Sequence, residues 1–331
     1  MINQDYPLIV DLDGTLIKTD LLFESFFKLI KINPIYIFIA TYWAFKGKSY
    51  LKHMIAQKTD IDVSLLPYNT ELLNYLRSQK DKRKLVLASA SNVKFVSQIA
   101  KYLDLFDHYL ASDANLNLSG HNKAKKLREL LGNDEYVYAG NSSDDLPIWN
   151  RCKQAITVNV SGRIAKKLTK TSVSIKADFK SEKTVLMTWL KCLRIHQWSK
   201  NFLIFVPLIL SQQYTSSIMV FDTLLAFLVF GLCSSSVYLL NDLLDIEDDR
   251  SNRSKKHRPI PSGKVSLIHA SIFIPILLTT SFYISGKFLP FEFNIFLVCY
   301  YSLTLAYSFY LKTKVLLDVQ VLAGLYTLRI V

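Results

Sequence analysis

The second half of the chain contains apolar segments of a length unusual for the core of a soluble domain. Residues 220–240, 267–288 and 293–311 each come close to the ~20 apolar residues that an α-helix needs to cross a bilayer, and short polar connections separate them. We expect further spans at 202–210 and from near Val315 onward. These segments predict an all-α, multi-span membrane domain.

The first half of the chain has a different character, because charged and apolar segments alternate there at the periods of globular helices and strands. A chain of 331 residues also exceeds the usual size of one domain. We therefore expect a soluble domain at residues 1–178, an interfacial linker helix at 179–200 and a membrane domain at 201–331. The linker is basic and amphipathic and carries Trp189 and Trp198.

The charge distribution indicates which side of the membrane each connection faces. The net charge is +13, and much of the excess lies beside the apolar segments, at 191–200, 250–264 and 312–314. Lys and Arg mark the cytoplasmic side of a membrane, so this pattern predicts a membrane partner and no nucleic acid. Because the N-terminus lacks the pattern of a signal peptide, we expect a multi-pass protein of the cell's inner (plasma) membrane with a cytoplasmic N-terminal domain.

Three short apolar runs in the first domain are each followed by polar residues. Residues 6–10 precede Asp11-Leu12-Asp13-Gly14-Thr15, residues 84–88 precede Ser89, and residues 135–139 precede Gly140-Asn141-Ser142-Ser143-Asp144-Asp145. Helical patterns alternate with these runs, which predicts a Rossmann-like α/β fold whose parallel sheet binds ligands at the carboxyl ends of its strands. A helical insertion at about 21–79 predicts a cap over that edge.

This order of motifs resembles the haloacid dehalogenase superfamily, specifically its phosphatase-type members with a helical cap after the first motif. The resemblance covers about the first 180 residues. It implies that Asp11 attacks the phosphoryl group of a phosphomonoester, and that Asp13 protonates the leaving oxygen and then activates water. It also implies a Mg²⁺ ion held by Asp11, the Asp13 carbonyl and Asp145, with Thr15, Ser89 and Lys123 binding the phosphate.

One position departs from that family's pattern. Asn141 stands where the family commonly has Asp, so an oxygen ligand is kept but a negative charge is lost. This predicts weaker metal binding unless Asp144 compensates.

A second acidic motif closes the apolar segment 220–240. It runs Asn241-Asp242-x-x-Asp245-x-x-x-Asp249, and a basic segment that includes Lys256, Arg258 and Pro259 follows it. Helical spacing puts Asn241, Asp245 and Asp249 on one face, with Asp242 beside them. Carboxylates gathered at a membrane surface can bind Mg²⁺ and through it a diphosphate, whose oxygens Lys256 and Arg258 could neutralise. The alternative is a charged loop that holds lipid headgroups.

The second motif resembles the first aspartate-rich motif of the UbiA prenyltransferase superfamily, and the likeness covers about residues 191–331. A later match is Tyr307-Ser308-Phe309-Tyr310-Leu311-Lys312. The segments 193–201 and 316–324 are most similar to the decaprenyl-phosphate phosphoribosyltransferase branch. The resemblance implies Asp242 and Asp245 as catalytic residues, a Mg²⁺ ion on Asp242, Asp245 and Asp249, and substrate contacts from Asn241, Lys256, Arg258, Tyr307 and Lys312. The superfamily's second aspartate-rich motif is absent from these residues, so we expect a truncated UbiA-type bundle.

Three functions remain open at this level. The first is phosphoribosyl transfer from phosphoribosyl diphosphate to a polyprenyl phosphate, with the phosphatase-like domain acting on the product. The second is prenyl transfer from a polyprenyl diphosphate to an aromatic acceptor such as 4-hydroxybenzoate. The third is a membrane-anchored, Mg²⁺-dependent phosphatase. The acidic motif does not separate the first two, because both begin by breaking a bond to diphosphate.

Overall fold

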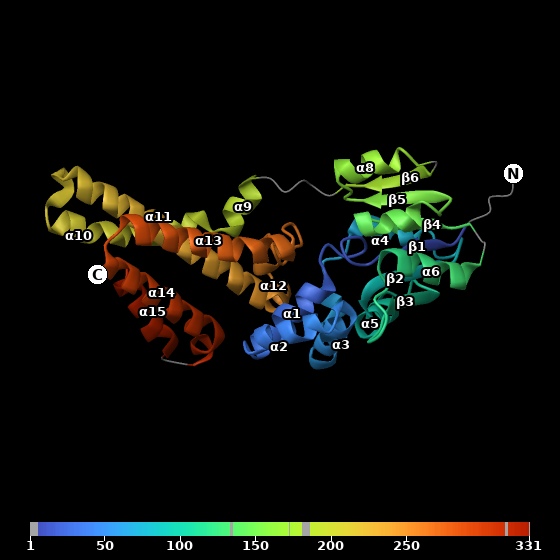
Figure 1. Cartoon of the computed structure of the whole chain (residues 1–331), viewed down its shortest axis with the longest axis horizontal. Helices are drawn as coiled ribbons and strands as arrows, with labels where there is room; N and C mark the ends of the chain where they lie inside the picture. The colour runs from blue at the N-terminus through green and yellow to red at the C-terminus, as the bar shows by residue number, and fades with distance from the viewer. Residues whose placement is uncertain (1–5, 133–134, 172, 181–185, 315–316, 331) are drawn as a thin grey trace. The chain divides into compact units, whose positions relative to one another are not determined.

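The computed structural model describes residues 6–132, 135–171, 173–180, 186–314 and 317–330. Its chain divides into two compact units, residues 1–183 (unit 1) and 184–331 (unit 2). Figure 1 traces the order of the elements along both units.

Unit 1 is built on a six-stranded parallel sheet with the order β3-β2-β1-β4-β5-β6. The strands are β1 (Leu8–Val10), β2 (Leu85–Asn92), β3 (His108–Ser112), β4 (Val137–Gly140), β5 (Gln154–Val158) and β6 (Ser174–Phe179). Strand β1 lies between β2 and β4, and its three residues are fully buried, as expected for a strand covered on both faces. The predicted parallel α/β fold is confirmed by this sheet.

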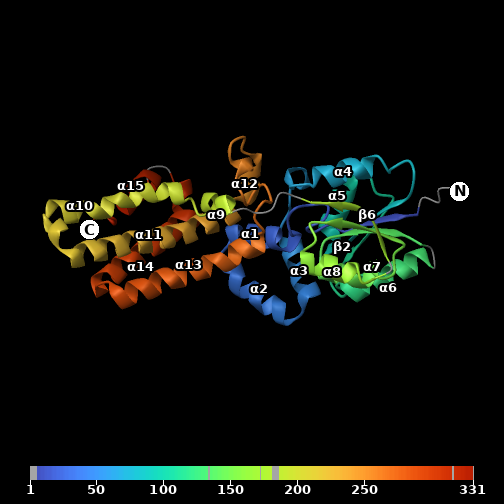
Figure 2. The same ribbon diagram turned by 90° about the horizontal axis from the view of Figure 1, so that it is seen from above.

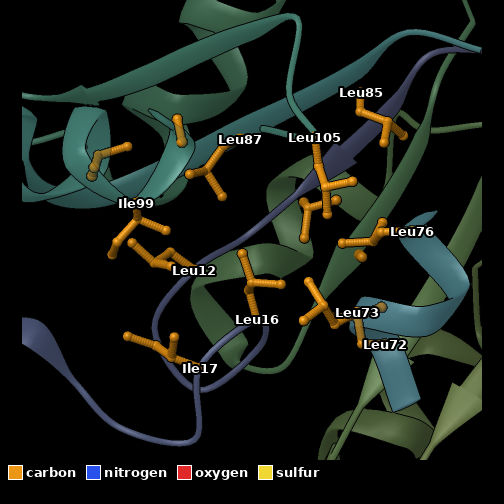
Figure 3. Packing of buried hydrophobic residues seen from close by; sticks show 14 of the residues in the cluster. Leu12, Leu16, Ile17, Leu72, Leu73, Leu76, Leu85, Leu87, Ile99 and Leu105 are labelled. Carbon is orange, nitrogen blue, oxygen red and sulfur yellow. The ribbon is translucent and has the colours of Figure 1, made fainter. Parts of the chain in front are cut away.

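Helices cover both faces of the sheet, as Figure 2 shows. Helices α4 (Thr70–Arg77) and α5 (Val93–Leu103) pack on the face to which Leu8 and Val10 point. Figure 3 shows leucines of this cluster from β2 and α4 meeting Leu12 and Leu16 of the loop after β1. Helices α6 (Gly120–Leu131), α7 (Leu146–Trp149) and α8 (Gly162–Leu168) pack on the face of Ile9.

The insertion after β1 forms three helices with a small core of their own. These are α1 (Leu21–Ile32), α2 (Tyr36–Phe45) and α3 (Lys48–Lys58), which pack together through Leu29, Trp43 and Ile55. A 3-10 turn, η1 (Val63–Leu65), follows. Helix α4 lies within the sequence range expected for the cap, yet its leucines belong to the core of the sheet.

Unit 2 is helical. Its elements are α9 (Leu186–Cys192), η3 (Ile195–Ile204), α10 (Phe205–Leu210), η4 (Gln213–Thr215), α11 (Ser217–Leu244), α12 (Ile246–Ser251), η5 (Lys255–His257), α13 (Leu267–Phe288), α14 (Phe291–Phe309), η6 (Leu311–Thr313) and α15 (Leu317–Thr327). Helices α11 and α13 pack side by side, and the Ser281 hydroxyl donates to the Val229 carbonyl oxygen at 3.0 Å. A Cβ on Gly231 would lie 2.7 Å from the ring of Trp198, so the absent side chain lets η3 approach α11.

Within the described residues, two helices have the length and apolar composition to cross a membrane, α11 and α13. Helix α14 is 19 residues long but is not among them. The segment 202–210, expected as a span, contains the end of the 3-10 helix η3 and the six-residue helix α10. Two candidate spans are therefore found where more were predicted.

Candidate functional sites

The first site lies at the carboxyl ends of β1 and β4 in unit 1. The Lys123 ammonium lies 2.6 Å from Asp11 Oδ1 and 3.9 Å from Asp145 Oδ1. The same ammonium donates to the Tyr138 hydroxyl at 3.1 Å, and that hydroxyl donates to Asp145 Oδ1 at 2.6 Å. All four side chains are buried. Asp11, which follows β1, and Asp145, which follows β4, thus share one lysine of helix α6.

Asp13 is held beside this cluster by hydroxyls of β2. Its Oδ2 accepts hydrogen bonds from Ser89 Oγ at 3.1 Å and Ser91 Oγ at 2.7 Å, and its Oδ1 accepts one from the Leu21 backbone N–H at 2.8 Å. The Thr15 hydroxyl donates to Asp11 Oδ2 at 3.2 Å. The structure therefore brings together all the site residues expected in unit 1.

The loop after β4 positions Asp145 through its own backbone. Asp145 Oδ2 accepts hydrogen bonds from the N–H groups of Asn141 and Ser142 at 2.9 and 3.0 Å. Two glycines allow the loop after β4 to pack closely, one against Asp145 and the other against the loop after β1. A Cβ on Gly140 would lie 2.6 Å from Asp145 Oδ2, and one on Gly14, whose φ is +74°, would lie 2.1 Å from Asn141 Nδ2. The amide of Asn141 thus lies directly against the loop that carries Asp11 and Asp13.

The electrostatics of this site suit a divalent cation. Burial raises the pKa of Asp11 to about 7; Lys123 lowers it, and Asp145 and Asp13 raise it by smaller amounts. Burial lowers the pKa of Lys123, but Asp11 and Asp145 raise it more, so the lysine stays charged. Asp11 and Asp145 lie against one ammonium, with Asp13 beside them, and their oxygens are hard ligands of the kind that Mg²⁺ prefers.

Replacing Asn141 with Asp tests whether the Asn at this position weakens metal binding. The extra carboxylate is expected to lower the Mg²⁺ concentration for half-maximal phosphate release about threefold to tenfold, because it adds a charged oxygen ligand. The measurement is a Mg²⁺ titration of p-nitrophenyl phosphate hydrolysis. Asn150→Asp, at an exposed position after α7, is the matched control and should leave the titration unchanged. An unchanged Asn141→Asp titration would contradict a metal role for this position.

The second site lies where α11 ends in unit 2. Asp242 and Asp249 are each 2% exposed, and Arg258 Nη1 donates to both, at 3.3 Å to Asp242 Oδ1 and 2.7 Å to Asp249 Oδ2. A second guanidinium, from Arg194, also donates to Asp242 Oδ1 and stacks 4.9 Å from the ring centroid of Tyr238. Arg194 has a φ of 52°, in the left-handed region that favours glycine.

The third carboxylate of the motif pairs with a lysine from far along the chain. Lys312 Nζ donates to the two oxygens of Asp245 at 2.9 and 2.8 Å. Asn241 Oδ1 is buried and has no hydrogen-bond donor among the described residues. Asn241 belongs to the same motif as the three carboxylates, and an orphaned buried oxygen is a group that a Mg²⁺ ion could use as a ligand.

The other predicted residues of unit 2 lie nearby in sequence but differ in their surroundings. Tyr307 is half-buried on the last turn of α14, close in sequence to Lys312. Lys256 is exposed, whereas its neighbour Lys255 lies 3.6 Å from Asp249.

Sequence reasoning did not assign four residues that the structure places in the sites. Ser91 and Tyr138 join the first site, and Arg194 and Lys255 join the second. The signal for Ser91 was its position two residues after Ser89 at the end of a strand. Arg194 stood in the segment most similar to the phosphoribosyltransferase branch, but nothing local linked it to Asp242.

Neither site shows a group of side chains already arranged as metal ligands among the described residues. Across the part of the chain that the structure describes, no group of three or more His, Cys, Asp and Glu side chains is arranged to hold a metal ion. In both sites a lysine or arginine lies against the carboxylates instead.

Unit 1 is an α/β part with a parallel sheet, and unit 2 is a helical part with two candidate membrane spans among the described residues. Residues 202–331 match the UbiA prenyltransferase family, so unit 2 carries a UbiA family domain. The decaprenyl-phosphate phosphoribosyltransferase of Mycolicibacterium smegmatis is 31% identical over 151 residues, which cover 44% of this chain and 47% of the relative.

A further relative covers both units. The uncharacterized protein y4nM of Sinorhizobium fredii is 36% identical over 330 residues, which cover 99% of this chain and 64% of the relative. The chain thus spans about half to two thirds of the length of these two relatives. A haloacid dehalogenase family hydrolase from Salmonella enterica serovar Typhi is a similar solved structure, with 17% identity, a TM-score of 0.38, and coverage of 52% of this chain and 66% of that chain.

Proposed function

We propose that the chain is part of a membrane transferase that moves phosphoribose from phosphoribosyl diphosphate to a polyprenyl phosphate, and that unit 1 is a Mg²⁺-dependent phosphatase. The observation that carries the transferase proposal is the pair of buried carboxylates, Asp242 and Asp249, joined by Arg258 at the end of a candidate span. Ionisable groups that are buried next to a membrane span are costly and are typically functional. Similarity to a decaprenyl-phosphate phosphoribosyltransferase supports this donor and acceptor.

In the proposed transfer, the bond between the anomeric carbon of the ribose and the diphosphate breaks, and an oxygen of the lipid phosphate bonds to that carbon. Arg194, Arg258 and Lys312 would stabilise the negative charge that develops on the leaving diphosphate. A Mg²⁺ ion on Asp242, Asp245 and Asp249 would supply further neutralisation of the diphosphate. Prenyl transfer to an aromatic acceptor uses the same leaving group, and the two are separated by the assay described in the Discussion.

In the proposed phosphatase reaction, an oxygen of Asp11 bonds to phosphorus while the bond to the leaving oxygen breaks and Asp13 gives that oxygen a proton. Asp13 then takes a proton from the water that hydrolyses the aspartyl-phosphate, which releases phosphate and restores Asp11. Ser89, Lys123 and Thr15 bind the phosphate oxygens. A Mg²⁺ ion held by Asp11, the Asp13 carbonyl and Asp145 would offset the charge of the phosphate. The 5-phosphate of the phosphoribosyl lipid is the substrate that links the two activities.

The proposed location is the inner membrane, with unit 1 and the 250–264 connection in the cytoplasm. This topology needs a crossing at the expected segment 202–210 in addition to α11, and cysteine labelling tests it. In a Cys299→Ser background, which removes an exposed thiol, Ser254→Cys should stay unlabelled by a membrane-impermeant maleimide in intact cells, whereas Tyr214→Cys should be labelled. The reason is the excess of Lys and Arg around residue 254. Labelling after cell lysis confirms that both thiols are reactive. The opposite pattern in intact cells would reverse the proposed topology.

A further inference from the structure

Helix α2 of unit 1 presents large apolar side chains to solvent. Ile35, just before the helix, and Phe38, Tyr42 and Phe45 within it are 60%, 78%, 59% and 87% exposed. Their spacing of three and four residues places all four on one face. Exposed apolar side chains are normal when scattered, but a contiguous row of this kind marks an interaction surface.

The opposite face of α2 accounts for its place in the fold. Ala40 and Trp43 are buried there against Leu29 of α1 and Ile55 of α3. The helix is thus anchored in the cap by one side only. The exposed row therefore does not contribute to the packing of the cap.

The charged residues that flank this row in the sequence are all basic. Residues 25–59 contain six lysines and no Asp or Glu. Lys46, at the end of α2, lies 4.9 Å from the ring centroid of Tyr42 and is exposed. Lysines that flank Phe and Tyr side chains are characteristic of helices that lie in the interface of an anionic bilayer.

We propose that α2 docks on an anionic lipid surface, with Ile35, Phe38, Tyr42 and Phe45 inserted among the lipid headgroups. The helix has 10 residues, about 15 Å at 1.5 Å per residue, so it lies in the interface and does not span the membrane. The candidate spans α11 and α13 follow in the same chain, so unit 1 is covalently linked to a segment that can enter a bilayer. Positive charge beside an apolar row complements lipid phosphates, and this favours lipid over a protein partner.

Helix α2 belongs to the insertion α1–α3, whose other two helices contact the first site. The α1 backbone N–H of Leu21 donates to Asp13, and Lys52 of α3 donates to the Ala90 carbonyl, between Ser89 and Ser91. A cap that lies on lipid therefore presents the site to phosphate groups at the membrane surface. This part rests on the proposed phosphatase activity and specifies its substrate class as phosphomonoesters carried by membrane lipids.

Photo-cross-linking tests the docking without any activity. Benzoylphenylalanine replaces Phe38 in the full chain, reconstituted in nanodiscs of phosphatidylglycerol and phosphatidylcholine. We expect lipid adducts by mass spectrometry at position 38, at least tenfold more than at Leu130, an exposed apolar residue of α6 used as the matched control. Adducts to protein segments alone, no adducts at position 38, or equal lipid adducts at the two positions would overturn the proposal.

A second measurement tests the substrate class. Phe38→Glu with Phe45→Glu should lower Mg²⁺-dependent phosphate release from phosphatidic acid in vesicles at least tenfold, and leave hydrolysis of p-nitrophenyl phosphate unchanged. Leu130→Glu should change neither rate. Equal losses on both substrates, or no loss on either, would contradict the proposed substrate class. If the unaltered protein hydrolyses neither substrate, the phosphatase proposal and this substrate class fail together, while the cross-linking result still decides the docking.

Discussion

Asp11→Asn is expected to lower Mg²⁺-dependent release of phosphate from p-nitrophenyl phosphate by about 10³-fold or more, because the substitution removes the attacking oxygen. The shape of the side chain is kept, and Lys123 still has Asp145 within 3.9 Å, so the fold should persist. The measurement is steady-state hydrolysis by the full chain in detergent, with and without excess chelator. Chelator should lower the rate of the unaltered protein to the same background.

Asp81→Asn provides the matched control for this experiment. Asp81 is exposed and lies in the turn before β2, and the same Asp-to-Asn change there should leave the rate within a factor of two. If Asp11→Asn keeps the activity of the unaltered protein, the assigned nucleophile is wrong. If chelator leaves the rate intact, the assigned metal dependence is wrong.

Asp245→Asn is expected to lower transfer by the second site about 10²-fold to 10³-fold, mainly in turnover. The carboxylate is held by Lys312, and loss of its charge would weaken a Mg²⁺ ligand and loosen a cation where the leaving diphosphate gains negative charge. Because this chain spans about half the length of the phosphoribosyltransferase relative, the assay uses membranes that carry the complete gene product. Glu292→Gln, an exposed change in the first turn of α14, is the matched control.

Two labelled donors separate the competing reactions. One assay supplies labelled phosphoribosyl diphosphate with polyprenyl phosphate, and the other supplies labelled prenyl diphosphate with 4-hydroxybenzoate. We expect labelled lipid in the first assay, little product in the second, and loss of the first signal in Asp245→Asn. Product only in the second assay would establish the aromatic prenyltransferase alternative. Activity that survives Asp245→Asn in either assay would exclude the proposed metal site.

Local pattern was sufficient to predict the parallel sheet and the place of the acidic residues in unit 1. A short apolar run that is buried on both faces identifies β1, and the acidic residues directly after it had to lie at the carboxyl edge of the sheet. The same reasoning worked for α11, whose apolar length and terminal acidic motif are both properties of one continuous segment. These features depend on neighbours in the sequence, so the sequence alone determined them.

The partners of those acidic residues were decided only by the tertiary structure. Lys123 reaches Asp11 across 112 residues, Lys312 reaches Asp245 across 67, and Arg194 reaches Asp242 across 48. Strand order placed β1 beside β4, and helix packing brought Arg194 and Lys312 to the end of α11. No periodicity along the chain records such pairings, because they arise when elements far apart in sequence bury their apolar faces together. The exposed row of α2 has the same origin, since packing alone chose which side of an apolar helix faces the core.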